Sequence, residues 1–185
     1  MFQERKVAQM AAFFLGQDTA GKMSRVKLMK LLYLSDREAV PAFGWLISGY
    51  RLACVPQGPT PAQTLILMEG DVELQNGGWE ARVSGNENHE ASAHEPLDAS
   101  SLDELAPAEI ETLKFVWTNF GATDKWEISD GTHQPFAEMS DPIGSSMPVR
   151  YESLDRVVGF DSTSAKQLAA QIQARHEIDA LFAAL

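Results

Sequence analysis

The feature that most constrains the fold is a long and unusually apolar stretch between Ser24 and Gly44. It opens on Ser24, a residue type whose hydroxyl caps helices by accepting a hydrogen bond from a backbone N–H. Seven apolar residues follow closely, namely Val26, Leu28, Met29, Leu31, Leu32, Tyr33 and Leu34. A helix that is apolar on most sides belongs in the centre of a core. We therefore expect a central buried helix that Pro41 and Gly44 end.

Basic residues interrupt the same stretch. Lys27, Lys30 and Arg37 fall on one helical face together with Leu34, which predicts a cationic strip that emerges from the buried helix. A DNA-reading helix must expose one whole side to the groove, and this helix is apolar on most of its circumference. The pattern therefore favours a strip that faces protein carboxylates or solvent.

Five further segments are predicted to be helices. An N-terminal helix carries Val7, Met10, Ala11 and Phe14 on one face and can stop at Gly16, and a long one runs from Pro107 to Gly121. Its apolar face comprises Ile110, Leu113, Val116, Trp117 and Phe120. Three further hydroxyl residues are expected to cap helices. Thr60, with Pro61 at the first helical position, begins one that runs through Met68; Thr123 begins one through Ser129; and Ser164 begins a terminal helix.

Extended structure is expected in two places. Residues 44–58 suggest irregular or short extended structure, and Asn76-Gly77-Gly78 predicts the turn of a β-hairpin between 72–74 and 79–83. The polar segments 85–101 and 139–148 are expected to be loops. The fold class is α+β, with a mostly α-helical domain, a small antiparallel β-hairpin or sheet and a C-terminal helix.

A chain of 185 residues fits one domain with an appendage. We expect a domain over residues 1–150 and a C-terminal helical extension over 151–185 that packs on it or on a partner. In the extension, Leu168 and Ile172 face one way, while Ile178, Leu181, Phe182 and Leu185 cluster on another side.

The charge is unevenly distributed. The net charge of -11 argues against general nucleic-acid binding, which needs a cationic surface. Residues 1–60 hold eight Lys and Arg against four Asp and Glu, and residues 61–185 hold seven against 22. Such a split lets the two parts attract one another within one fold, or gives an acidic surface for a basic partner protein; the first is favoured.

The sequence offers little that points to chemistry or to a membrane. The apolar runs are far shorter than the roughly 18 residues that span a bilayer, and no secretory signal opens the chain, so a cytoplasmic location is expected. Cys54, the single cysteine, can form no internal disulfide. The pairs His89-Glu90 and His94-Glu95 lie five residues apart, a spacing unsuited to a helical metal site. No phosphate-binding glycine loop or serine-hydrolase motif occurs. We expect no cofactor, no metal and no catalytic activity.

The central helix carries a resemblance to a known family. The segment from Gly21 to Asp36, with Lys30-Leu31-Leu32-Tyr33 at its centre, resembles the signature of the Panacea domain of SocA-like antitoxins. Gly49 to Ala53 and then Gln57-Gly58-Pro59 resemble the segments that follow. Thr132-His133 resembles a later element, although this chain has Pro135-Phe136 where the family tends to have proline and tryptophan. The resemblance covers roughly residues 2–140.

This resemblance implies the antitoxin of a bacterial or phage toxin–antitoxin pair, which neutralises a cognate toxin by direct protein contact. Alternatives are an adaptor that delivers the toxin to a AAA+ protease, and a phage-associated accessory protein. A homodimer remains open, as does the choice of the 85–101 loop or the C-terminal helix as the interface. The family-motif positions are Lys30, Leu31, Leu32, Tyr33, Gly58, Pro59 and His133.

Packing is the favoured role for Leu28, Leu31, Leu32 and Tyr33, because contiguous exposed apolar patches are uncommon. The partner surface must then consist of other residues. Interfaces favour aromatic residues and arginine. The candidates are the exposed members of a set comprising Tyr50, Arg51, Trp79, Trp126, Phe136 and Phe182.

Overall fold

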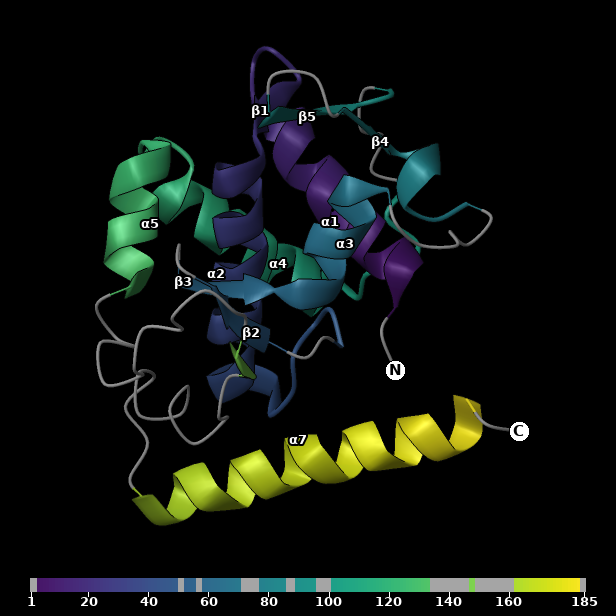
Figure 1. Ribbon diagram of the computed structural model, residues 1–185, viewed down its shortest axis with the longest axis vertical. Coiled ribbons are helices and arrows are strands. Elements are labelled where there is room, and N and C mark those ends of the chain that lie inside the picture. Colours follow the sequence, from purple (N-terminus) through teal and green to yellow (C-terminus); the bar gives the residue numbers. More distant parts are fainter. Residues whose placement is uncertain are drawn as a thin grey trace.

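The computed structural model describes residues 3–49, 52–55, 58–70, 77–85, 89–95, 101–133, 147–148 and 162–183. It is mostly helical with small antiparallel sheets, which confirms the α+β class (Figure 1). The helices are α1 (Glu4–Gln17), α2 (Arg25–Phe43), α3 (Ala62–Glu69), the 3-10 helix η1 (Trp79–Ala81), α4 (Pro107–Phe120), α5 (Lys125–His133) and α7 (Ser162–Ala183). The strands are β1 (Lys22–Ser24), β2 (Leu52–Val55), β3 (Gly58–Pro61), β4 (Val83–Ser84), β5 (Glu90–Ala93) and β6 (Met147–Pro148).

Helix α2 is the centre of the molecule, as its composition predicts. It contacts α1, α3, α4, α5 and β3, which surround it in Figure 1. The Ser24 hydroxyl accepts a hydrogen bond from the Lys27 N–H at 3.2 Å, and Gly44 closes the helix in the left-handed conformation. Pro41 does not end the helix, because proline removes one amide donor but keeps a helical φ, and α2 continues to Phe43.

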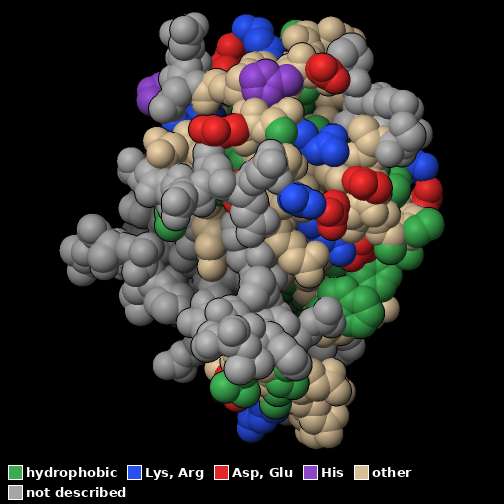
Figure 2. Space-filling model, turned by 90° about the vertical axis from the view of Figure 1, so that its right-hand side faces the viewer, with side chains coloured by type: hydrophobic (Ala, Val, Ile, Leu, Met, Phe, Trp, Pro, Cys, Tyr) green, Lys and Arg blue, Asp and Glu red, His purple; other side chains and the backbone are tan. Residues whose placement is uncertain are grey.

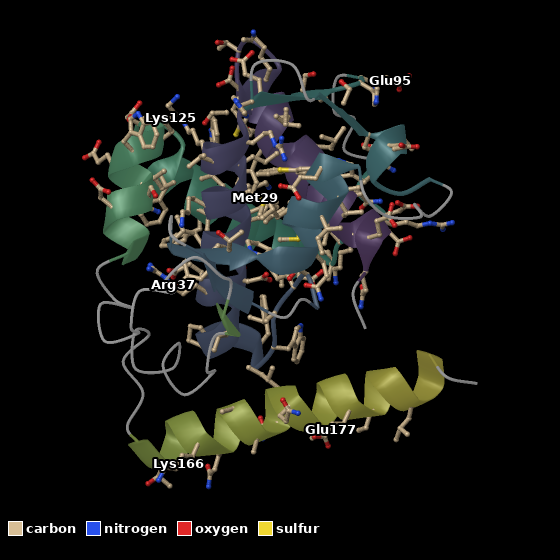
Figure 3. The ribbon with its side chains drawn as sticks, viewed as in Figure 1. Met29, Arg37, Glu95, Lys125, Lys166 and Glu177 are labelled. Atoms are coloured by element: carbon tan, nitrogen blue, oxygen red, sulfur yellow. The ribbon has the colours of Figure 1, made fainter. Side chains whose placement is uncertain are left out.

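The apolar faces predicted for the flanking helices pack against α2. On α1, Val7, Met10, Ala11 and Phe14 are all fully buried. On α4, Leu113 and Val116 are fully buried, while Ile110, Trp117 and Phe120 pack partly buried against the same core. Figure 3 places Met29 of α2 in the middle of this assembly. The period of the apolar residues therefore predicts both helices correctly.

The two small sheets differ from the sequence prediction. One has the order β1-β5-β4 and the other β3-β2-β6, and every pairing is antiparallel. The segment 85–101 was expected to be a loop, but β5 is the central strand of its sheet, with Ala91 buried. The alternation in β5 has only alanine as its apolar residue, and alanine favours strands little, so pairing on both sides makes this segment a strand.

The predicted hairpin around Asn76-Gly77-Gly78 is wrong in its second arm. Trp79–Ala81 coils into η1, and the Trp79 N–H donates to the buried carboxylate of Glu4 at 2.9 Å. The strand that follows, β4, pairs with β5. The first predicted arm, 72–74, lies outside the described residues.

Three predicted helix starts are shifted. Thr60 and Pro61 pair with Ala53 and Leu52 in the β2–β3 ladder, so α3 begins at Ala62 and runs one residue past Met68. Helix α5 follows Asp124, whose carboxylate accepts from the Trp126 N–H at 2.8 Å, because aspartate caps better than the neighbouring threonine.

The other shifted start is at α7, and the end of α5 is also displaced. Helix α7 begins at Ser162 rather than Ser164, since the run 162–164 offers several hydroxyls of similar capping power. Helix α5 runs past Ser129 to His133. Of the predicted loop 139–148, Met147–Pro148 forms β6 against β2, and the rest lies outside the described residues.

Charged groups from the two halves of the chain meet inside the fold. Lys6 of α1 donates to Glu109 of α4 at 2.7 Å, and both side chains are nearly buried. Lys22 of β1 pairs with Glu90 of β5, also at 2.7 Å. These pairs agree with the favoured interpretation of the charge split, in which cations of the first part attract carboxylates of the second.

Helix α7 lies across the end of the molecule at which α2 ends (Figure 1). Ile172 is buried and belongs to the core, whereas Ile178 and Leu181 are exposed, as the change of apolar side predicts. Lys166 and Glu177 lie on the side of α7 away from the body (Figure 3). Among the described helices, none combines the length and the hydropathy that crossing a bilayer requires.

Replacing Leu32 tests whether the central helix holds the fold. Leu32 is fully buried on α2, so Leu32→Ala removes buried methyl groups and leaves a cavity. We expect it to lower the free energy of unfolding by about 2–5 kcal/mol in urea denaturation. Ile66→Ala on the exposed side of α3 is the control and should cost under about 1 kcal/mol. Equal losses for the two variants would contradict a central role for α2.

Candidate partner-binding site

The family-motif residues of α2 form the core, not a surface. Leu31, Leu32 and Tyr33 are fully buried, and Lys30 is 1% exposed. Gly58 and Pro59 lie in β3, where Pro59 pairs with Cys54 and Gly58 with Val55. His133 is the last residue of α5, and its side chain lies outside the described part. The motif therefore holds the central helix and one edge of a sheet in place.

The predicted cationic strip on α2 does not emerge at the surface. Lys27 donates to the Gly121 carbonyl at 2.6 Å, at the C-terminal end of α4, and lies 5.9 Å from the Trp117 ring centroid. Lys30 is buried, and Arg37 pairs with the neighbouring Glu38 at 2.9 Å. Lys27 and Lys30 are held within the fold, and Arg37 pairs with a residue of its own helix. These cations therefore stabilise packing and do not form a binding surface.

A buried carboxyl joins α2 to the segment after it. Asp36 is fully buried and accepts hydrogen bonds from the Ser48 N–H at 3.0 Å and from the Ser48 hydroxyl. Burial raises the pKa of Asp36 to about 7, although hydrogen bonds from Ser48 and from the Ile47 backbone and the charge of Lys6 favour the ionised form. Ser48 is itself fully buried, so the pair is out of reach of a substrate and acts as an internal contact.

Of the six predicted partner-binding residues, the structure describes two side chains. Trp126 of α5 is 61% exposed, and the Lys125 ammonium lies 5.2 Å from its ring centroid. Trp79 is 5% exposed and belongs to the core, so it is not one of the exposed members of the set. Tyr50, Arg51 and Phe136 lie outside the described residues, and Phe182 lies in α7 with its side chain outside them.

Other exposed apolar side chains were missed by the sequence analysis. Phe115 of α4 is 53% exposed, and Trp45 is 40% exposed with its ring stacked on Phe43. Phe115 could have been found, because it stands between Leu113 and Val116 yet off the apolar face of its helix. Ile178 and Leu181 of α7 are also exposed, and the sequence does predict them on a separate side of that helix.

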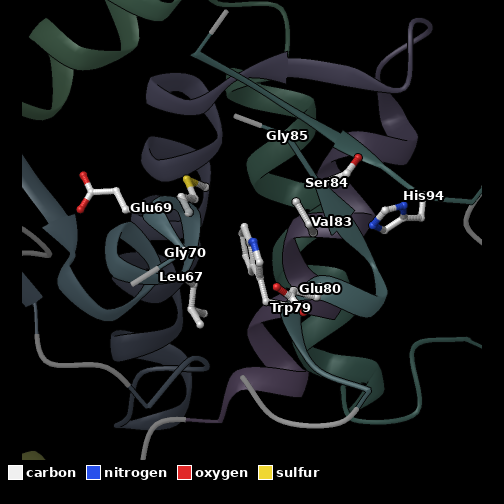
Figure 4. A pocket seen from close by; sticks show the side chains of 10 residues that line it. Leu67, Glu69, Gly70, Trp79, Glu80, Val83, Ser84, Gly85 and His94 are labelled. Atoms are coloured by element: carbon white, nitrogen blue, oxygen red, sulfur yellow. The ribbon is translucent and has the colours of Figure 1, made fainter. Parts of the chain in front are cut away.

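A groove opens between the C-terminal turn of α3 and the η1–β4 segment (Figure 4). Its volume is about 450 Å³. The apolar part comprises Leu67, Met68, Trp79 and Val83, and the rest of the lining comprises Glu69, Gly70, Glu80, Ser84, Gly85 and His94. Within the described residues, no group of three or more His, Cys, Asp or Glu side chains is placed to hold a metal ion.

The face of the molecule shown in Figure 2 carries acidic and basic side chains interspersed with one another. The excess of acidic residues in the second part of the chain therefore does not make this face uniformly negative. Recognition of a basic partner on this side must depend on local carboxylates rather than on one large acidic field.

Comparison with protein families decides the classification. Residues 28–137 match the family model described as antitoxin SocA-like, Panacea domain, which is more than half of the chain. The chain belongs to this Panacea-domain family. The match spans the described helices from α2 to α5, including the buried motif on α2. No match was found among curated proteins or among solved structures.

The Asp36 contact predicts a pH dependence of stability for this Panacea domain. The folded-state pKa of about 7 lies above the ordinary value of 3.8, so the folded state holds a proton that the unfolded state loses first. The contribution of the Asp36 carboxyl to the free energy of unfolding therefore falls as pH rises from about 4 to about 7, by roughly 4 kcal/mol in total. Above about pH 7 this contribution no longer changes.

Asp36→Asn isolates this contribution. The asparagine oxygen can still accept from the backbone amides, and its NH₂ group can donate to the Ser48 hydroxyl. The unfolding free energy, measured in urea between pH 5 and pH 8, should fall less steeply with pH in the variant than in the native chain. Identical slopes for the two proteins would show that the Asp36 carboxyl ionises normally.

Proposed function

We propose that this chain is the antitoxin of a toxin–antitoxin pair and neutralises its cognate toxin by direct protein contact, without catalysis of its own. Membership of the SocA-like antitoxin family supports an antitoxin-type role. The buried position of the described motif side chains also supports it, because residues that build the core leave the surface free to fit one partner. Neither observation requires a reacting group.

The observation that carries the proposal is the exposure of large aromatic residues on the family-matched helices. Trp126 of α5 is 61% exposed and Phe115 of α4 is 53% exposed. A rigid helix that presents an aromatic side chain to water loses little conformational entropy on binding and gains much from burying it. Such residues are the usual anchors of protein interfaces.

A second candidate function is an adaptor that delivers the toxin to a AAA+ protease. An adaptor needs two separate binding surfaces. The C-terminal end of α7 lies on the opposite side of Figure 1 from α5, which bears Trp126. That end of α7 carries the exposed Ile178 and Leu181. This separation favours keeping the adaptor as an alternative to simple occlusion.

Co-expression tests the antitoxin proposal. The protein encoded beside this chain should arrest growth when produced alone, and growth should recover when this chain is produced with it. Colony counts measure the recovery, and a pulse-chase of the toxin separates the two mechanisms. Occlusion leaves the toxin half-life unchanged, whereas delivery shortens it in cells with the protease. A neighbour that is harmless alone contradicts the antitoxin role.

Trp126→Ala tests the aromatic anchor. Truncation of a central interface tryptophan costs about 2 kcal/mol or more, so we expect the variant to bind the toxin roughly thirty-fold more weakly in calorimetry. Lys114→Ala on the exposed side of α4 is the control and should bind with nearly native affinity. Both side chains are exposed, so both variants should keep the native unfolding free energy. Native affinity for Trp126→Ala would remove α5 from the interface.

A further inference from the structure

We propose that the groove between α3 and η1–β4 receives a short basic segment of the bound toxin, with an apolar side chain on the groove floor and a Lys or Arg on each side of it. The inference rests on the proposed function, since the segment belongs to the toxin. It assigns a site distinct from Trp126, because the described residues that line the groove include none from α4 or α5.

The floor of the groove is apolar and firmly held. Leu67, Met68, Trp79 and Val83 are each at most 5% exposed, and all four belong to the hydrophobic core. The Trp79 backbone is fixed by the Glu4 carboxylate, and its indole stands between α3 and Val83 (Figure 4). A floor of this kind is pre-formed, so an incoming aliphatic side chain covers its small exposed apolar area without reorganising the protein.

The volume sets the size of the occupant. A space of about 450 Å³ is far larger than one leucine side chain and much smaller than a folded domain. It fits a short stretch of extended or turning chain that places one apolar residue against the Trp79 edge. The groove is therefore suited to a segment of a partner, while the larger exposed surfaces would contact its body.

The charge at the rim defines the flanking residues of the occupant. Among the described lining residues, the ionisable side chains are Glu69, Glu80 and His94, and none is a lysine or arginine. Glu69 on α3 and Glu80 on η1 lie on opposite sides of Trp79 in Figure 4, and both are exposed. The C-terminal turn of α3, which Gly70 closes, adds the partial negative charge of its last carbonyls.

A segment crossing this groove therefore passes a carboxylate on either side of its apolar anchor. Basic side chains fit both positions, whereas acidic ones meet like charge. The wider charge of the chain, -11, attracts the same kind of partner during approach. The three observations together, an apolar floor, a peptide-sized volume and two flanking carboxylates, select a Lys/Arg–apolar–Lys/Arg segment.

Peptide titration tests the site without the toxin. The full ¹⁵N-labelled chain is titrated with acetyl-Gly-Arg-Leu-Arg-Gly-amide, and in parallel with peptides in which Glu replaces both Arg or Ser replaces Leu. The Arg-Leu-Arg peptide should shift the amide signals of Met68 and Ser84 and the Trp79 indole signal. The Glu-Leu-Glu peptide should not, and the Arg-Ser-Arg peptide should bind more weakly.

The variant Glu69→Gln/Glu80→Gln should lower the affinity for the Arg-Leu-Arg peptide about five-fold at low salt. The matched control Glu104→Gln/Glu111→Gln removes the same charge at exposed positions outside the groove and should leave that affinity unchanged. Shifts that miss the groove residues, equal binding of the Glu-Leu-Glu peptide, or an equal loss in the control would each overturn the site. Growth rescue by the native chain alongside such a result would leave the antitoxin proposal standing.

Discussion

The burial of α2 is the constraint on which the rest of the structure depends. A helix with apolar residues on nearly every side must be covered on nearly every side, and α1, α3, α4, α5 and β3 all contact it. Each surrounding element packs on one face of α2, so its position follows from the apolar face that it buries. The sheet of β1, β5 and β4 lies at the start of this helix, because Ser24, the last residue of β1, is its N-terminal cap.

Several polar groups that enter this core are matched by partners that come from distant parts of the chain. Lys6 meets Glu109, and Gln9 donates to Asp103 at 2.6 Å while accepting from the Glu104 N–H at 2.9 Å. Burying such groups is costly unless they are paired, so each pair fixes α1 against the start of α4 in one register. Part of the charge asymmetry of the sequence thereby serves internal order.

Periodicity predicts the long helices and fails for the short strands, for a physical reason. The faces of α1 and α4 repeat at helical spacing because each buries one side against α2, and that requirement is written in the local sequence. The strand β5 has no such signal, because its small residues owe their conformation to pairing with β1 and β4. Trp79 illustrates the same limit: an aromatic beside Gly77-Gly78 predicts a hairpin, yet contact with Glu4 coils it into η1. The apolar period of α4 marks only its buried face, and Phe115 lies off that face, so periodicity does not reveal it.

The buried motif also explains what family membership can and cannot specify. Leu31 and Tyr33 lie within the family-matched residues and are fully buried, so they build the domain and do not contact a partner. A partner, by contrast, contacts exposed residues. These residues can change without loss of packing in the core. Trp126 on α5 and the rim carboxylates Glu69 and Glu80 of the groove are positions of this second kind: each is exposed on an element that the core holds, and none is part of the core. Selection for one toxin can therefore act on these surfaces without disturbing the fold that presents them.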